Sequence, residues 1–187
     1  MIIDYSDLID SKQVISQDAY IVGRVEGVRY SAPNFSIEGI IVRCEKEASN
    51  ILGGGSAKSR VLIRPDSFEF RDVLLLGNNL EDEKPNVKPD SDAFPQVENL
   101  LGMQVVTADN EILGTVKTIQ LDVESWYLHT FSVKLDKEAH GKLGIKKLLF
   151  AKELTGLLAE NIANVAPEQI NLTLTMEEVK QTMQLAE

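Results

Sequence analysis

The chain has 187 residues, of which 43% are hydrophobic and 26% charged, a composition typical of a folded protein with one ordinary domain or two small ones. Its net charge of −10 argues against a protein whose main task is to neutralise nucleic-acid phosphates. One cysteine excludes an intramolecular disulfide, and with only two histidines it leaves too few ligands for a structural zinc site.

The first ten residues, "MIIDYSDLID", have neither the basic start nor the apolar stretch of a secretory signal. No run of the chain approaches the ~20 apolar residues that a membrane-spanning helix needs. We therefore expect a cytoplasmic protein without a transmembrane segment, which reaches a membrane only if a partner recruits it.

The sequence contains an internal duplication. "YIVGRVEGVRY" (residues 20–30) and "EILGTVKTIQL" (residues 111–121) share their apolar pattern, with Gly23 falling on Gly114 at an offset of 91 residues. The register continues without a gap and carries Phe35 onto Trp126, Ile40 onto Phe131 and Val42 onto Val133. Agreement at successive apolar positions predicts two copies of one structural unit.

Each copy reads as a series of short β-strands. "VGRVEGVRY" and "LGTVKTIQL" mix β-branched and polar residues at short period, and "IEGIIV" and "LHTFSV" follow after turns that contain Pro, Asn or Asp. Short strands at this spacing predict small β-sheets that are closed or nearly closed.

The stretch "ILGGGSAKSR" (residues 51–60) resembles a phosphate-binding loop at first sight. Such a loop needs glycine where Leu52 and Ala57 stand, and it must lead into a helix, whereas "RVLI" predicts a strand. We interpret it as a connection between strands that tolerates insertions. The second copy reaches "KLLF" after its own loop, which puts Val61 on Leu148 at an offset of 87 residues.

The remaining segments set the expected domain boundaries. Residues 78–99 are rich in Pro, Asn and acidic side chains, which is typical of a linker, so we expect domains at 1–77 and 100–187. The final "TMEEVKQTMQLAE" begins with a capping box, Thr175 and Glu178, followed by apolar residues at helical spacing. It predicts a short C-terminal helix that packs on the second domain.

The repeated pattern resembles the PRC-barrel family. The resemblance rests on Gly23 and Gly114, the glycine-rich loop, the "VLIRPDSF" segment and the closing "DVLLL". It implies an all-β fold of two tandem, small, antiparallel PRC-type β-barrels joined by the acidic linker. The second copy departs from the pattern, because Ala151 and Lys152 stand where the first copy has Arg64 and Pro65.

Candidate catalytic and metal-binding residues are few. His129, aligned with Glu38, is either a partly buried side chain at a barrel end or a proton-transfer residue. Cys44 aligns with Leu135, which favours a small core residue over a nucleophile. We interpret the acidic run at residues 81–83 as linker charge rather than a metal site. The sequence therefore predicts a protein that is not an enzyme, with no catalytic, cofactor or metal site.

All six arginines lie in the first copy, and arginine is favoured at interfaces. We hypothesise that the first barrel presents an arginine-bearing face to an acidic partner; ordinary surface charge is the alternative. Trp126, the single tryptophan, either packs in the barrel or marks a contact site. The candidate partner-binding residues are Arg43, Arg60, Arg64 and Trp126.

The function expected from the resemblance is that of an adaptor. PRC-barrel proteins bind other proteins or ribonucleoprotein, and some archaeal members act in cell division with the machinery that anchors FtsZ filaments to the membrane. We therefore expect a non-enzymatic scaffold for protein partners, such as division or membrane-anchor proteins, with homo-oligomerisation left open. The alternative is a ribosome-maturation factor of the RimM kind, which binds a ribosomal protein or ribosomal RNA; the acidic charge counts against direct RNA binding.

Overall fold

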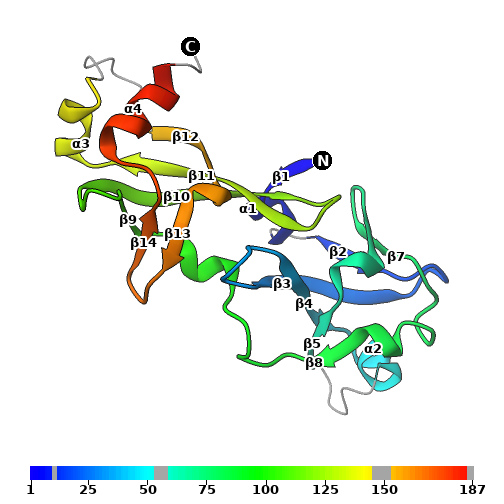
Figure 1. Ribbon diagram of the computed structural model, residues 1–187. Helices are drawn as coiled ribbons and strands as arrows, with labels where there is room; N and C mark the ends of the chain where they lie inside the picture. Colours follow the sequence, from blue (N-terminus) through cyan, green and yellow to red (C-terminus); the bar gives the residue numbers. More distant parts are fainter. Residues whose placement is uncertain (10–11, 53–58, 145–152, 185–187) are drawn as a thin grey trace. The chain divides into compact units, whose positions relative to one another are not determined.

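The computed structural model describes residues 1–9, 12–52, 59–144 and 153–184, and its elements are labelled in Figure 1. The "GGGSAK" loop (residues 53–58) and "KLLF" (residues 147–150) lie outside the described residues. The chain divides into two units. The first comprises residues 1–98 and 122–127, and the second comprises residues 99–121 and 128–187.

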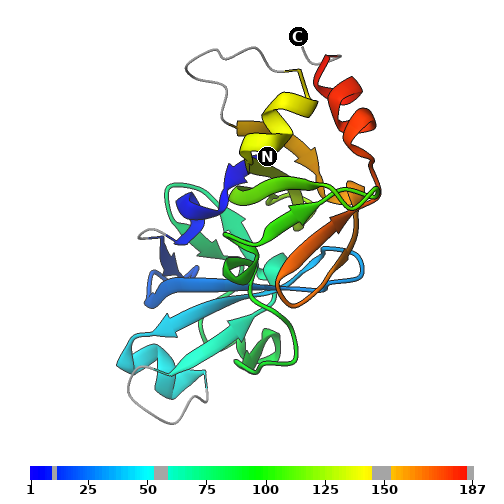
Figure 2. The same ribbon diagram turned by 90° about the vertical axis from the view of Figure 1, so that its left-hand side faces the viewer.

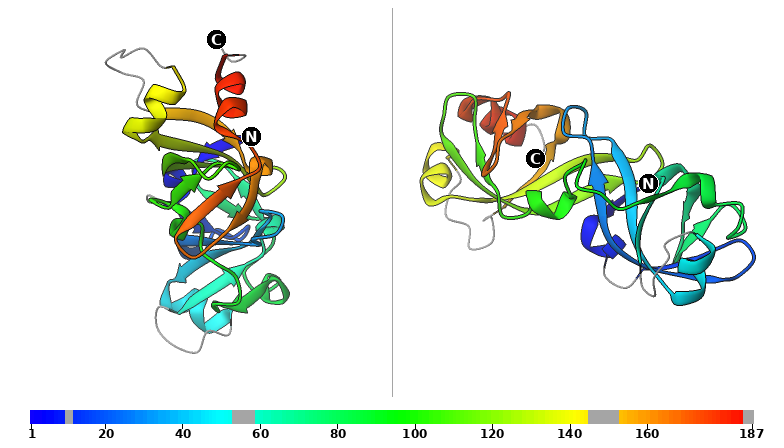
Figure 3. Two further views of the ribbon diagram at one scale, coloured as in Figure 1. Left: turned by 60° about the vertical axis from the view of Figure 1, so that its left-hand side comes forward. Right: turned by 90° about the horizontal axis from the view of Figure 1, so that it is seen from below.

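The first unit is built on one sheet in the order β6-β7-β2-β3-β4-β5-β8, in which every neighbouring pair is antiparallel except β2 and β7. Figures 2 and 3 show the long strands β3 and β4 side by side. The elements are β1 (Ile2–Asp4), α1 (Tyr5–Ile9), β2 (Gln13–Ile15), β3 (Ile21–Tyr30), β4 (Ile37–Cys44), α2 (Lys46–Ile51), β5 (Arg60–Ile63), β6 (Phe68–Phe70), β7 (Leu74–Leu76) and β8 (Val87–Pro89).

The second unit has the sheet order β12-β11-β10-β9-β14-β13, with β14 and β9 parallel. Helices α3 and α4 lie at one end of this unit (Figure 1). The elements are β9 (Gln104–Val106), β10 (Ile112–Asp122), β11 (Tyr127–Leu135), α3 (Lys137–Lys142), β12 (Glu153–Leu158), β13 (Ile162–Val165), β14 (Gln169–Leu172) and α4 (Met176–Gln184). The all-β fold class and the short C-terminal helix are therefore confirmed.

The start of α4 has the capping box that the sequence predicted. The Thr175 N–H donates to Glu178 Oε2 over 2.8 Å, and the Glu178 N–H donates back to Thr175 Oγ1 over 3.3 Å. Met176 and Val179 are buried, so the apolar side of the helix packs on its own unit. Met183, the third residue of the expected stripe, has a side chain outside the described part.

The duplication is visible in the backbone. A Cβ atom built on Gly23 would lie 2.1 Å from the carbonyl oxygen of Arg43, and one built on Gly114 would lie 2.0 Å from that of Lys134. Each contact links β3 to β4, or β10 to β11, at positions 91 residues apart. Glycine is required at both places because the neighbouring strand leaves no room for a side chain.

The turn before each long strand is also duplicated. Ser16 Oγ donates to Asp18 Oδ1 over 2.5 Å, and Thr107 Oγ1 donates to Asp109 Oδ1 over 2.6 Å. Ala19 and Asn110, which follow these acids, have positive φ angles of 64° and 62°. The hydroxyl and carboxylate stabilise the turn in each unit, which a comparison of apolar positions could not reveal.

The structure corrects the alignment of the last part of the repeat. Ile63 of β5 pairs with Ile40, and Leu157 of β12 pairs with Phe131. Because Ile40 and Phe131 are equivalent, Ile63 corresponds to Leu157, at an offset of 94 residues instead of 87. "KLLF" was matched to "RVLI" because both are short apolar runs, but the strand that pairs with β11 is "ELTGLL".

The connections after β4 and β11 also differ from expectation. Both begin with a short helix, α2 at Lys46–Ile51 and α3 at Lys137–Lys142, again 91 residues apart. Ala48 and Ala139 are the buried residues at equivalent positions of these helices. Each connection therefore begins with a helix that includes residues predicted from the sequence to form a loop, Ile51 in the first copy and residues 140–142 in the second.

Much of the segment expected to be a linker packs on the first sheet. β8 pairs with β5, with Leu62 opposite Lys88, and Leu80 and Val97 are buried. The carboxylate of the fully buried Glu83 accepts hydrogen bonds of 3.0 Å from the side chains of Asn78 and Asn86. A composition poor in apolar residues suggested a solvated tether, but a few buried apolar and hydrogen-bonded polar side chains hold this segment in place.

Candidate functional site

Three arginines of the first sheet form a row across neighbouring strands. Arg24 of β3 lies opposite Arg43 of β4, which lies opposite Arg60 of β5. Side chains at directly opposed positions stand next to each other on a sheet, and like charges there repel. Carboxylates close to such a row reduce this repulsion.

Carboxylates neutralise two of these three arginines. Glu26 forms ion pairs with Arg43 and with Arg60, whose Nε atom lies 3.2 Å from Glu26 Oε2. The Arg60 Nη2 atom also lies 3.3 Å from Asp90 Oδ2, in the segment that follows β8. Asp90 additionally pairs with the buried Arg29 over 3.0 Å. The acidic segment therefore supplies part of the charge that neutralises the arginine row.

Of the other expected contact residues, Arg64 lies outside this network, because it pairs with the exposed Asp66 two residues away. Arg71 is paired in the same way with Glu69. Trp126 is only 8% exposed, which agrees with packing and leaves little of its ring for a partner. The structure thus brings Arg43 and Arg60 together and places Arg64 and Trp126 elsewhere.

Arg24 differs from the other five arginines. Within the described part of the chain it forms no ion pair, whereas each of the others faces a carboxylate. Its side chain is exposed, and it lies next to Arg43 in the row. An exposed guanidinium without an ion pair gains from any carboxylate that approaches it.

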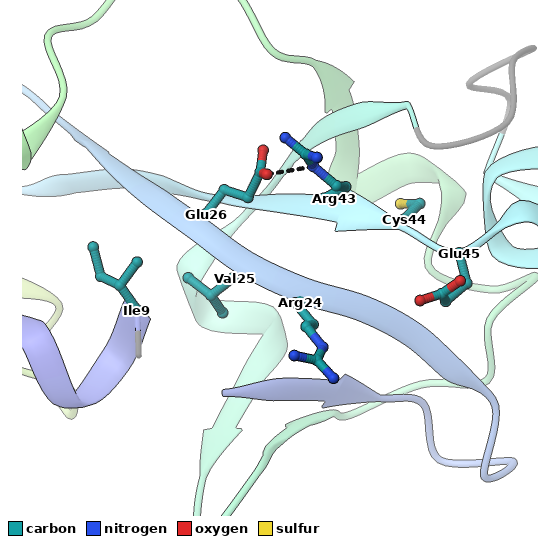
Figure 4. A pocket seen from close by; sticks show the side chains of 7 residues that line it. All are labelled: Ile9, Arg24, Val25, Glu26, Arg43, Cys44 and Glu45. Atoms are coloured by element: carbon teal, nitrogen blue, oxygen red, sulfur yellow. Dashed lines mark ion pairs between the residues drawn. The ribbon is translucent and has the colours of Figure 1, made fainter. Parts of the chain in front are cut away.

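Two adjoining hollows meet at Arg24. One, of about 430 Å³, is lined by apolar side chains and by Arg24, Glu26, Arg43 and Glu45, and Figure 4 shows it with the ion pair between Glu26 and Arg43. The other, of about 590 Å³, also includes Arg24 and Glu45. We call the combined depression the Arg24 groove and define it by Tyr20, Ile21, Arg24, Glu45, Lys46 and Glu47.

The groove combines charge with exposed apolar surface. Tyr20 is 45% exposed and Ile21 51%, although both are large apolar side chains at the start of a sheet strand. The equivalent residues of the second unit are Glu111 and Ile112, and Thr115 stands where the first unit has Arg24. Glu111 is paired with Lys142. The tyrosine and the unpaired arginine are therefore features of one copy, and scaffold requirements do not explain them.

Arg24 and Tyr20 were not among the site residues predicted from the sequence. The predicted arginines lie near the glycine-rich loop, and the sequence does not show which carboxylates face them. The duplication held the needed signal, since Arg24 aligns with Thr115 and Tyr20 with Glu111 in otherwise similar strands.

The remaining candidates for chemistry do not form a site. Burial, with a smaller contribution from the charge of Glu45, raises the pKa of the Cys44 thiol to about 11. His129 and His140 are both partly buried. Within the described ranges, no three His, Cys, Asp or Glu side chains are placed to hold a metal ion.

No helix among the described residues is both long and apolar enough to cross a membrane.

Part of the chain matches the model of a known protein family. Residues 96–149 match the PRC-barrel domain model. The match covers the Gly114 strand and its partner, so the PRC-barrel resemblance drawn from the residues is confirmed there. No curated protein matches the sequence. Among solved structures, RimM from Pseudomonas aeruginosa, described as a 16S ribosomal RNA processing protein, aligns with 13% identity and a TM-score of 0.30 over 82% of this chain and 98% of that chain. That likeness is too slight to carry an inference.

Proposed function

We propose that this protein is a non-enzymatic adaptor that binds protein through the Arg24 groove of its first unit. The observation that carries the proposal is the exposed Arg24, which has no ion pair among the described residues, beside the exposed side chains of Tyr20 and Ile21. Tyrosine and arginine dominate the binding energy of protein interfaces, because each combines a large contact area with directed hydrogen bonds.

The charges around the groove revise the partner that the sequence predicted. Glu45 and Glu47 line it together with Arg24 and Lys46, so the signs balance. A strongly acidic partner, or the phosphates of a nucleic acid, would meet these two carboxylates. The groove instead supports a protein surface that carries both signs of charge around an apolar centre.

The PRC-barrel match is compatible with two cellular processes. The resemblance implies a scaffold in FtsZ-based cell division of archaea, or a factor of the RimM kind in ribosome maturation. Both assign protein binding to the barrel, and both remain predictions for this chain. The proposal is therefore made at the level of protein binding.

Site-specific photocrosslinking tests the groove directly. A photoreactive phenylalanine at position 20 should give a covalent adduct in native cells, and Arg24→Glu should abolish that adduct. The same probe at position 111, the equivalent place in the second unit, serves as the matched control. An adduct at position 20 that is insensitive to Arg24→Glu, or no adduct, would contradict the proposal. Recovery of division proteins or of ribosomal proteins in the adduct would decide between the two processes.

A further inference from the structure

We infer that the occupant of the Arg24 groove is the same groove of a second copy of this chain, in a two-fold symmetric dimer. The inference rests on the proposed function, since it names the protein that the groove binds. It is carried by the pattern of unpaired charges around Tyr20 and Ile21.

Two oppositely charged side chains of the groove have no ion pair with any residue that the structure describes. Within the described ranges, neither Arg24 nor Glu45 forms an ion pair, and Figure 4 shows both at the groove with none drawn between them. Arg24 lies opposite Arg43, and Glu45 follows two residues after Arg43. A diagonal position of this kind on a sheet places Cα atoms roughly 7–8 Å apart. The two groups are thus close to each other without neutralising each other.

Two further charged residues of the groove, Lys46 and Glu47, are again one cation and one anion. Lys46 and Glu47 are exposed at the start of α2, and neither has an ion pair among the described residues. Among the described residues, the groove therefore carries two cations and two anions without an ion pair. A surface that lacks net charge but contains separated charges is best complemented by a surface with the opposite arrangement.

Two-fold symmetry supplies that arrangement without a second kind of protein. In a symmetric dimer, whenever residue i of one protomer contacts residue j of its partner, residue j of the first contacts residue i of the partner. Arg24 of each protomer can then pair with Glu45 of the other, which neutralises both unpaired groups twice. The same contact would cover the exposed side chains of Tyr20 and Ile21, whose apolar area favours association.

The second unit does not offer an equivalent surface. Thr115 replaces Arg24, and Glu111 replaces Tyr20 and is paired with Lys142. The charge corresponding to Glu45 is Asp136, whose side chain accepts a hydrogen bond from the Glu138 N–H at the start of α3. This unit therefore lacks both the arginine and the tyrosine that the inferred contact needs.

Charge exchange at two positions provides the experiment. We expect the unmodified chain to sediment as a dimer at tens of micromolar, and both Arg24→Glu and Glu45→Arg to weaken the dimer at least about tenfold by opposing like charges. Glu45 makes no capping hydrogen bond with its side chain, so neither change should unfold the exposed site. Circular dichroism checks the fold, and Thr115→Glu in the second unit is the matched control that should leave the dimer intact.

The two variants also test the symmetry. Mixed together, they should form a one-to-one heterodimer, because positions 24 and 45 then carry two carboxylates in one chain and two guanidinium groups in the other. The double variant should form a homodimer again, since each of its two contacts regains opposite charges. Native mass spectrometry distinguishes these species.

Two results would overturn the inference: a monomeric wild-type chain, or a dimer unaffected by both single changes. If the crosslink at position 20 still depended on Arg24 but joined a different protein, the proposed function would stand and the dimer would not.

Discussion

Arg29 and Asp90 form a buried ion pair that connects β3 to the segment after β8. The Arg29 Nε atom lies 3.0 Å from Asp90 Oδ1, and the two side chains are 5% and 9% exposed. Arg29 Nη1 also donates to the Phe94 carbonyl oxygen over 2.7 Å, and Nη2 reaches the fully exposed Asp92 over 3.1 Å. One guanidinium therefore fixes three points of a segment with little apolar surface.

Arg29→Ala should lower the free energy of unfolding by about 3 kcal/mol, because it leaves the Asp90 carboxylate buried with a weaker set of partners. It should also expose the segment around Asp90 and Phe94 to limited proteolysis. Urea unfolding and mass analysis of the cleavage products measure the two effects. Arg64→Ala, which breaks an exposed pair with Asp66, is the control and should cost less than about 1 kcal/mol. Equal effects of the two changes would show that burial of the Arg29 pair has no special role.

The two close strand approaches predict strong effects of very small changes. Gly23→Ala and Gly114→Ala should each destabilise the protein by about 3 kcal/mol or more, since the added methyl group collides with a backbone carbonyl that cannot rotate away. Gly141→Ala is the control. Its added methyl group would meet nothing within 4 Å, and alanine in the helix α3 should stabilise by about 0.5–1 kcal/mol. Thermal unfolding of the three variants gives the comparison, and a tolerated Gly114→Ala would contradict the close approach.

The fold was predictable from sequence wherever the two copies could be compared position by position. Gly23 and Gly114 share an environment, and the offset of 91 residues holds from the turn at Ser16 to the short helices α2 and α3. Two copies of one backbone must satisfy the same steric conditions, so agreement between them indicates structure without knowledge of the fold.

The prediction failed where apolar pattern alone had to identify a strand. "KLLF" was chosen for its short apolar run and lies outside the described residues, whereas Leu157, in the run "ELTGLL", is the residue that pairs with Phe131. The prediction that residues 78–99 form a linker was wrong for a different reason. The packing of this segment depends on Arg29 and Glu83, and polar side chains that become buried only in the folded chain leave no periodic signal in the sequence.

The candidate site could be predicted only in part, because its definition depends on which charges remain unpaired. Arg43 and Arg60 were expected to face a partner, but Glu26 forms an ion pair with each of them and Asp90 with Arg60. Arg24 was counted among the arginines without being selected. Ion pairing between distant residues, such as Arg60 and Asp90, follows from the sheet order and cannot be read from composition.

The duplicated turns predict a specific dependence of stability on pH. The hydrogen bonds from the Thr107 hydroxyl and the Met176 N–H lower the pKa of Asp109, and those from the Ser16 hydroxyl and the Leu80 N–H lower the pKa of Asp18. A carboxyl group with a lowered pKa binds fewer protons in the folded chain than in the unfolded chain. Its stabilising contribution is therefore present above the ordinary pKa of aspartate, about 3.9, and is lost as the pH falls through the folded value.

Asp109→Ala should accordingly lower the melting temperature at neutral pH, and the difference from wild type should shrink below about pH 4. Asp18→Ala should behave in the same way, because it occupies the equivalent turn. Glu168→Ala, at an exposed carboxylate, is the control and should leave the melting temperature nearly unchanged at both pH values. A difference between wild type and Asp109→Ala that stays constant down to acid pH would mean that the carboxylate charge does not contribute.

Cys44 should react with thiol reagents only when the first sheet opens. Its side chain is 1% exposed, and burial is the main cause that raises the pKa of the thiol to about 11. The thiolate is the reactive species, so at pH 8 both its scarcity and its burial protect it. A disulfide reagent should label the native chain far more slowly than the urea-unfolded chain, and Gly23→Ala, which strains the strand next to Cys44, should speed native-state labelling. Gly141→Ala should leave the rate unchanged. Fast labelling of the unmodified native chain would show that Cys44 is accessible and would contradict its place in the core.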